Sequence, residues 1–71
     1  MILYLTTPGT SVKMDQGRLV INEGQSGHLV RSIPKEQVDS IAVFGRIHLT
    51  TEVLIHCMIR GIPVSYYSRQ G

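Results

Sequence analysis

A chain of 71 residues is long enough for one small domain. The core of such a domain is marginal, because buried area and ordering entropy roughly cancel below about 80 residues. Seven Lys and Arg against five Asp and Glu give a net charge of +2, and the basic residues are spread evenly along the chain. This spacing is typical of a solvated polar face, whereas strongly basic nucleic-acid-binding modules cluster their charge.

Cysteine usage and apolar run length indicate where the protein resides. The single cysteine, Cys57, excludes an internal disulfide and suits a reducing, cytoplasmic environment. No charged-then-apolar leader opens the sequence, so we do not expect secretion. No apolar run approaches the roughly 20 residues of a membrane helix, so we expect no membrane association.

The first half of the chain reads as a run of short strands. Residues 2–6 show no polar alternation, which predicts a strand buried on both faces. Residues 11–15 alternate as a half-exposed strand does, and residues 18–23 pair back after Asp15-Gln16-Gly17, predicted as a three-residue hairpin loop. A second turn at 24–27 leads to a strand over 28–33, which Pro34 ends.

The second half adds strands around one helix. A short helical or 3₁₀ turn is expected after Pro34, then a β-branched strand over 40–45 and a very short strand over 47–49. Residues 62–67 return as a last strand. We therefore predict a mainly β domain with one short helix (α+β), in which six or seven short strands form a small two-sheet β-sandwich.

The helix is expected near residues 51–60. Thr50 or Thr51 is a natural N-cap, and Gly61 suits a left-handed C-cap. Apolar residues at spacings of three and four predict the face that packs on the sheet, namely Val53, Leu54, Cys57 and Met58. Ile55 and Ile59 widen the apolar surface, so the helix is expected to be covered on a second side as well.

No group of residues in the chain has the pattern of an active site. The five acids are scattered, and the spacing of His28, His48 and His56 matches no metal-ligand motif, so we expect three separate surface histidines. Cys57 is expected to be a small core residue. In Tyr66-Tyr67 one ring must point inward, to the core, and the other outward, where it could stack on DNA or on a partner subunit.

The order of motifs resembles a known family. It begins with the N-terminal MILYLTTPGTSVKMDQGRLVI and continues with IP and an acidic loop, SIAVFG, a Thr-led helix and RGIPVSYYSRQG. This ordered set is similar to the N-terminal β-domain of CRISPR-associated protein one. That family comprises the DNA endonuclease and integrase of spacer acquisition. The resemblance covers essentially all 71 residues and implies a single domain, either cut from a longer protein or a truncated product.

The resemblance also implies where chemistry lies. In that family the metal-binding Glu, His and Asp belong to a larger helical domain that follows this one, so no residue here inherits a catalytic, cofactor or metal role. The full-length protein is expected to use Mg²⁺ or Mn²⁺ to join prespacer DNA to the CRISPR repeat by transesterification. This chain alone is expected to be no enzyme.

The implied partners are a second copy of the domain, the small ferredoxin-like second adaptation protein, and double-stranded DNA. A chain that is 42% hydrophobic with so little interior must expose or cover apolar surface, and we predict a homodimer interface at Phe44, Ile47 and Tyr67. A monomer whose apolar face contacts the helical domain is the alternative. Candidate DNA contacts are Arg18, Arg46 and Arg69. The competing function is a stand-alone small β-domain for protein–protein interaction.

Overall fold

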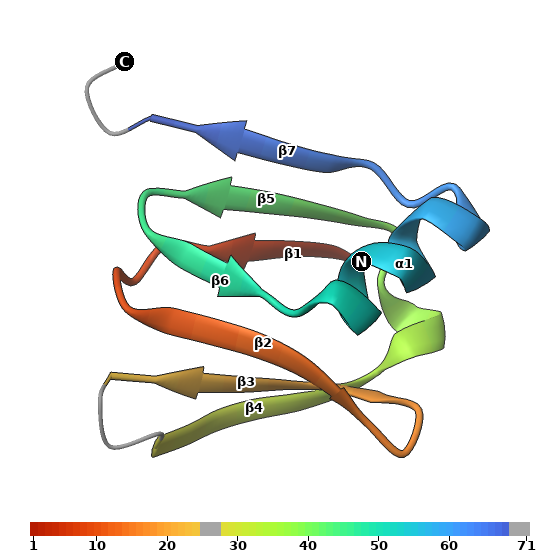
Figure 1. Cartoon of the computed structure of the whole chain (residues 1–71), viewed down its shortest axis with the longest axis horizontal. Coiled ribbons are helices and arrows are strands. Elements are labelled where there is room, and N and C mark those ends of the chain that lie inside the picture. Colours follow the sequence, from red (N-terminus) through yellow and green to blue (C-terminus); the bar gives the residue numbers. More distant parts are fainter. Residues whose placement is uncertain (25–27, 69–71) are drawn as a thin grey trace.

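The computed structural model describes residues 1–24 and 28–68, which form strands around one α-helix (Figure 1). In chain order the elements are β1 (Ile2–Leu5), β2 (Thr10–Asp15), β3 (Arg18–Glu23), β4 (His28–Pro34), the 3₁₀ helix η1 (Lys35–Gln37), β5 (Ser40–Phe44), β6 (Ile47–Leu49), α1 (Thr51–Arg60) and β7 (Val64–Tyr67). The predicted mainly β fold with one helix near 51–60 is confirmed.

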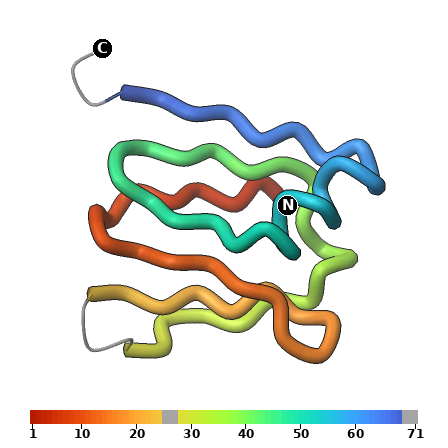
Figure 2. Tube along the Cα trace, viewed as in Figure 1, coloured from red at the N-terminus to blue at the C-terminus, as the bar shows by residue number. Residues whose placement is uncertain are grey.

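The strands form two sheets. The first sheet has the order β1-β5-β7 with all pairings parallel. The second has the order β4-β3-β2-β6, antiparallel except for the parallel pair of β2 and β6. The turn between β5 and β6 takes the chain from the first sheet to the second, as the trace shows (Figure 2). The predicted two-sheet arrangement is therefore confirmed.

The core lies between the inner faces of the sheets and the helix. It draws on both sheets, on α1 and on the segment after η1; its most buried large side chains are Leu3, Val12, Leu19, Ile41, Val43 and Val53. Alternate residues of β1, β2 and β3 supply this core, namely Leu3, Leu5, Val12, Leu19 and Ile21, as expected for strands with one exposed face. Of the described residues, no helix has the length and apolar character to span a membrane.

Capping residues fix both ends of α1. The Thr50 hydroxyl accepts a hydrogen bond from the Val53 amide at 3.4 Å, so Thr50 is the N-cap. Gly61 has φ 67°, and its amide donates to the carbonyls of Cys57 and Met58. This left-handed C-cap favours glycine because a side chain there is strained. Both predicted ends of the helix are confirmed.

The helix buries a narrower face than the sequence predicted. Val53 and Cys57 are buried and Leu54 is half-buried, but Met58 is 80% exposed. The prediction for Met58 was wrong, as was that of a covered second side, since Ile55 and Ile59 are exposed. Residues 53–55 and 57–59 are all apolar, so spacing alone could not fix how the helix is rotated.

Three strand predictions also need correction. Strand β1 is buried on one face only, because Ile2 and Tyr4 are exposed. It lies at the edge of a small parallel sheet. One ring of the Tyr66-Tyr67 pair was predicted to lie in the core. Tyr66 is on the inward side, since it pairs with the buried Val43, but it is 63% exposed because β7 is the other edge strand.

The third correction concerns the β2–β3 hairpin. Asp15 pairs with Arg18, which leaves a two-residue loop in place of the predicted three-residue one. Gln16 and Gly17 have φ values of 51° and 77°, the pattern of a type I′ turn. The second predicted turn, at 24–27, falls largely on residues 25–27, which lie outside the described residues.

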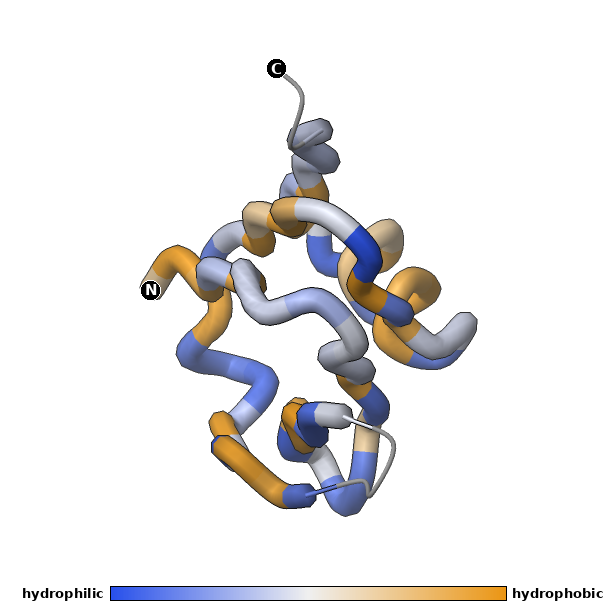
Figure 3. The backbone as a smooth tube through the Cα atoms, turned by 90° about the vertical axis from the view of Figure 1, so that its left-hand side faces the viewer, coloured by the Kyte–Doolittle hydropathy of each residue, from blue (hydrophilic) through white to orange (hydrophobic). Residues whose placement is uncertain are grey.

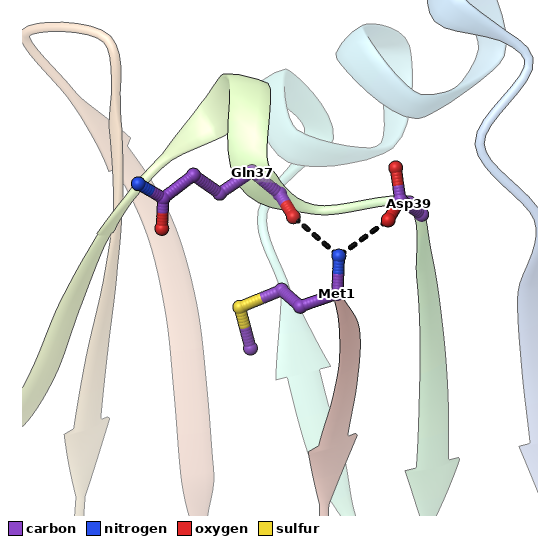
Figure 4. A network of polar contacts seen from close by, with 3 residues as sticks. All are labelled: Met1, Gln37 and Asp39. Atoms are coloured by element: carbon purple, nitrogen blue, oxygen red, sulfur yellow. Dashed lines mark hydrogen bonds and ion pairs between the residues drawn. The ribbon is translucent and has the colours of Figure 1, made fainter.

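The start of the chain is held against the segment before β5. The Met1 ammonium donates to the Gln37 carbonyl at 2.7 Å and pairs with the Asp39 carboxylate (Figure 4). The Asp39 amide donates back to the Met1 carbonyl at 2.8 Å. Because Asp39 is 80% exposed, the ion pair adds little stability, and its main effect is to align β1 with β5.

The buried face of α1 can be tested with one substitution on each side of the helix. Val53→Asp should lower the free energy of unfolding by about 3–5 kcal/mol and unfold so small a domain, because it buries an unpaired charge at a fully buried position. Met58→Asp should keep the wild-type circular dichroism spectrum and change the melting temperature little. Unfolding of the Met58 variant would contradict this placement of the helix.

Candidate interaction surface

Two aromatic rings stack on the outer face of the three-stranded sheet. Phe44 of β5 and Tyr67 of β7 are register partners, with ring centroids 4.8 Å apart and an angle of 14° between the rings. They point outward because the alternate residues Ile41 and Val43 are buried in the core. Stacking fixes the orientation of the rings, while Tyr67 stays 51% exposed.

The first strand continues this apolar surface. Tyr4 is the register partner of Ala42 in β5, so Ile2 and Tyr4 lie on the same outer face as Phe44. They are 50% and 60% exposed. We call Ile2, Tyr4, Phe44 and Tyr67 the sheet patch. An exposed apolar patch of this kind on a small domain is typical of an interaction site, since water contact with it is unfavourable.

The three residues predicted for the dimer interface are only partly brought together. Phe44 and Tyr67 stack, but Ile47 belongs to β6 of the other sheet and is half-buried against the core. The sequence analysis missed Ile2 and Tyr4, because an unbroken apolar run was read as a strand buried on both faces. Only the parallel pairing of β1 with β5 at the sheet edge shows that they face outward.

The predicted DNA contacts do not form one basic patch. Arg18 is held across the second sheet, where its guanidinium donates to the Ser32 hydroxyl at 2.7 Å and the Ser32 carbonyl at 3.0 Å. Arg46 is exposed in the β5–β6 turn. The two arginines lie beside opposite ends of β2. Its last residue, Asp15, pairs with Arg18, and its first, Thr10, pairs with Ile47, the neighbour of Arg46; the two ends of a strand of this length are roughly 17 Å apart. Arg69 lies outside the described residues.

The histidines and acids offer no metal centre within the described residues, where no three His, Cys, Asp or Glu side chains come together. His28 and His48 are exposed, as predicted. His56 is not: it is half-buried, and its Nε2 atom is fully buried with no hydrogen-bond partner in the described structure. The prediction of three surface histidines was wrong for His56, because the narrow buried face of α1 leaves it at the rim of the core.

Cys57 is a core residue, as predicted. It is 3% exposed and packs in the core cluster. Burial raises the pKa of the Cys57 thiol above its usual value of 9.0, because the thiolate is poorly solvated there. A raised pKa is the opposite of what a nucleophilic thiol needs, so the structure gives Cys57 a packing role.

The raised pKa of Cys57 predicts a loss of stability in alkali. Its contribution is complete below the unfolded pKa of 9.0 and is lost as pH rises through the higher folded pKa. Thermal melts between about pH 7 and about pH 10 should therefore fall more steeply for the wild type than for Cys57→Ala, which cannot ionise. Equal slopes for the two proteins would contradict a thiol buried in the native state.

Comparison with known proteins identifies the family. A family model for the CRISPR associated protein Cas1 matches residues 3–71. The chain belongs to the Cas1 family. A CRISPR-associated endonuclease Cas1 from Thermus thermophilus is 38% identical over 71 residues, which are all of this chain and 22% of that relative. The resemblance to CRISPR-associated protein one is thereby confirmed.

Solved structures share the fold. A Cas1 protein from Thermotoga maritima has a TM-score of 0.75 at 27% identity, over 99% of this chain and 21% of that one. A chain of a partial Cas6-RT-Cas1–Cas2 complex has a TM-score of 0.86 at 20% identity, over 100% of this chain and 21% of that one, which shows the fold alone. This chain thus spans about a fifth of the length of its Cas1 relatives and corresponds to their N-terminal β-domain.

Proposed function

We propose that this chain is the dimerisation and DNA-supporting domain of a cytoplasmic Cas1 endonuclease and integrase that inserts prespacer DNA into CRISPR arrays. The sheet patch is the observation that supports the proposal most strongly. Four large apolar side chains, two of them stacked, face outward from a domain whose own core is already filled by other residues. A surface of this kind in so short a chain is best explained by a partner that covers it.

The proposed partner on the sheet patch is a second copy of the domain. A two-fold dimer brings the same patch together from both copies, so each aromatic pair meets apolar side chains of the other subunit. Aromatic side chains are well suited to such contacts, because they bury large areas with little loss of conformational entropy. Ile47 is the third proposed interface residue, and it would extend the contact from the first sheet to β6.

Catalysis is assigned to the rest of the protein. The acids Asp15, Glu23, Glu36, Asp39 and Glu52 lie at or beside strand ends, in η1 and at the start of α1, and no three of them come together. We propose that the full-length protein binds Mg²⁺ or Mn²⁺ outside this domain and catalyses transesterification there. Its further partners would be the second adaptation protein, Cas2, and double-stranded DNA; solved Cas1–Cas2 complexes contain the same fold. Arg18 and Arg46 are the described candidates for DNA contact.

The dimer is tested by sedimentation of the purified chain across micromolar concentrations. The wild type should shift from monomer to dimer, and Tyr4→Ala with Tyr67→Ala should weaken association by at least about tenfold, since the patch loses two exposed rings. Comparing the Phe44→Ala, Tyr67→Ala double variant with the triple variant that adds Ile47→Ala then shows whether the interface reaches β6.

Ile55→Ala with Met58→Ala is the matched control, because these exposed apolar residues lie on α1 and not on the sheet patch. It should dimerise as the wild type does. A monomer at every concentration would refute dimerisation by this chain. A dimer that survives loss of the patch residues would keep the assembly and refute the interface.

The assignment of catalysis predicts that this chain has no metal-dependent activity. With Mg²⁺ or Mn²⁺ it should leave linear and branched DNA intact, because its carboxylates cannot share two ions about 4 Å apart. The measurement is gel analysis of labelled DNA after prolonged incubation. Cleavage that disappears on substitution of a single Asp or Glu would contradict the prediction.

A further inference from the structure

A pocket of about 560 Å³ lies between η1 and the C-terminal half of α1. Its walls include four charged side chains, one imidazole and one exposed apolar side chain, namely Lys35, Glu36, Asp39, Arg60, His56 and Ile59. The size is within the range of ligand pockets, and none of these residues belongs to the sheet patch. The pocket is therefore a second feature that the proposed dimer does not explain.

His56 has a polar atom that lacks a partner. Its Nε2 is buried, and nothing in the described structure accepts from it or donates to it. Buried polar atoms are nearly always hydrogen-bonded, because an unpaired one loses its contacts with water and gains nothing in return. His56 also lines the pocket, so a rotation of its ring would turn Nε2 toward a bound group that supplies the missing partner.

The charges of the pocket favour an anion. Neither Lys35 nor Arg60 has an ion pair within the described residues, whereas Asp39 is already paired with the Met1 ammonium. Glu36 is the one remaining acid in the described wall without an ion pair. Two available cations against one acid leave positive charge beside the unpartnered imidazole, and an Nε2–H group donates well to a carboxylate.

An apolar ridge continues the pocket along the helix. Ile55, Met58 and Ile59 are 48%, 80% and 76% exposed, and their spacing of three and four residues places them on one side of α1. Figure 3 shows the helix as the coil on the side of the molecule opposite the N-terminus, with much of it coloured hydrophobic. Ile59 belongs to both the ridge and the pocket wall.

We propose that the pocket and this ridge are a docking site for a polypeptide segment with an Asp or Glu beside a large apolar side chain. On binding, the His56 ring rotates and the carboxylate accepts from its Nε2–H between Lys35 and Arg60, while the apolar side chain covers Ile59 and Met58. A phosphate backbone fits less well, since it would meet Glu36 and an apolar ridge. A protein segment is also available in the longer relatives, where the match leaves roughly four-fifths of the chain outside it.

Nuclear magnetic resonance titration of the 71-residue chain tests the site. The probes are the peptide acetyl-Ile-Glu-Leu-amide and its Gln counterpart, which differ only in the charge of the carboxyl group. The Glu peptide should cause saturable shifts at Lys35, His56 and Ile59 and bind at least about tenfold more tightly than the Gln peptide. The ¹⁵N shift of His56 Nε2 should move to that of a nitrogen whose N–H donates a hydrogen bond.

Two variants and one control make the assignment specific. His56→Phe keeps a ring in the wall without a polar atom, and Arg60→Gln removes one charge. Each should remove the preference for the Glu peptide and leave the domain folded, as circular dichroism would show. Lys13 is exposed on β2, outside the pocket wall, so Lys13→Glu should leave peptide binding unchanged. The proposal is overturned if the two peptides bind equally, if no shift saturates, or if only a short DNA duplex perturbs the pocket residues.

Discussion

The fold depends on the pairing of β5 with both edge strands of the first sheet. Ile41, Ala42 and Val43 are buried in succession, since β5 is the central strand and has a neighbour on each side. Those neighbours are the first and the last strands of the chain, so β5 joins the two ends. Parallel strands must be joined by long crossover connections. Here β2, β3 and β4 lie in the connection from β1 to β5, and β6 and α1 lie in the connection from β5 to β7. Loss of this pairing would separate the second sheet from its partner layer.

Sequence reasoning succeeded where local chemistry decides the structure. Thr50 and Gly61 set the helix ends whatever surrounds them, and Pro34 and Gly17 mark a strand end and a turn. It failed where packing decides. The rotation of α1 and the exposed face of β1 depend on which neighbour lies alongside, and an apolar run such as residues 2–5 has no internal signal for that. The pocket at His56 could not be predicted either, because it forms between two segments that are far apart in the sequence.

A small domain of this composition has more apolar side chains than its core can bury, so some of them lie on its surface. Two groups of them stand out, the sheet patch and the ridge on α1, and Leu29 and Val30 of β4 are exposed as well. The sheet patch is flat, aromatic and fixed by backbone pairing, which suits a self-complementary two-fold contact. The ridge is aliphatic and adjoins a charged pocket, which suits a segment of a different composition. The difference between them is a physical reason to assign them to different partners.

The function proposed for this domain depends on its surfaces. Its backbone superposes on a chain of a solved complex with a TM-score of 0.86 at 20% identity, so quite different sequences form this fold. The half-buried Phe44 and the exposed Tyr67 contribute to no core position, yet their stacking orders them in the unbound domain. Side chains that are ordered before they bind lose less entropy on association, so this stacking would favour the proposed contact of the sheet patch.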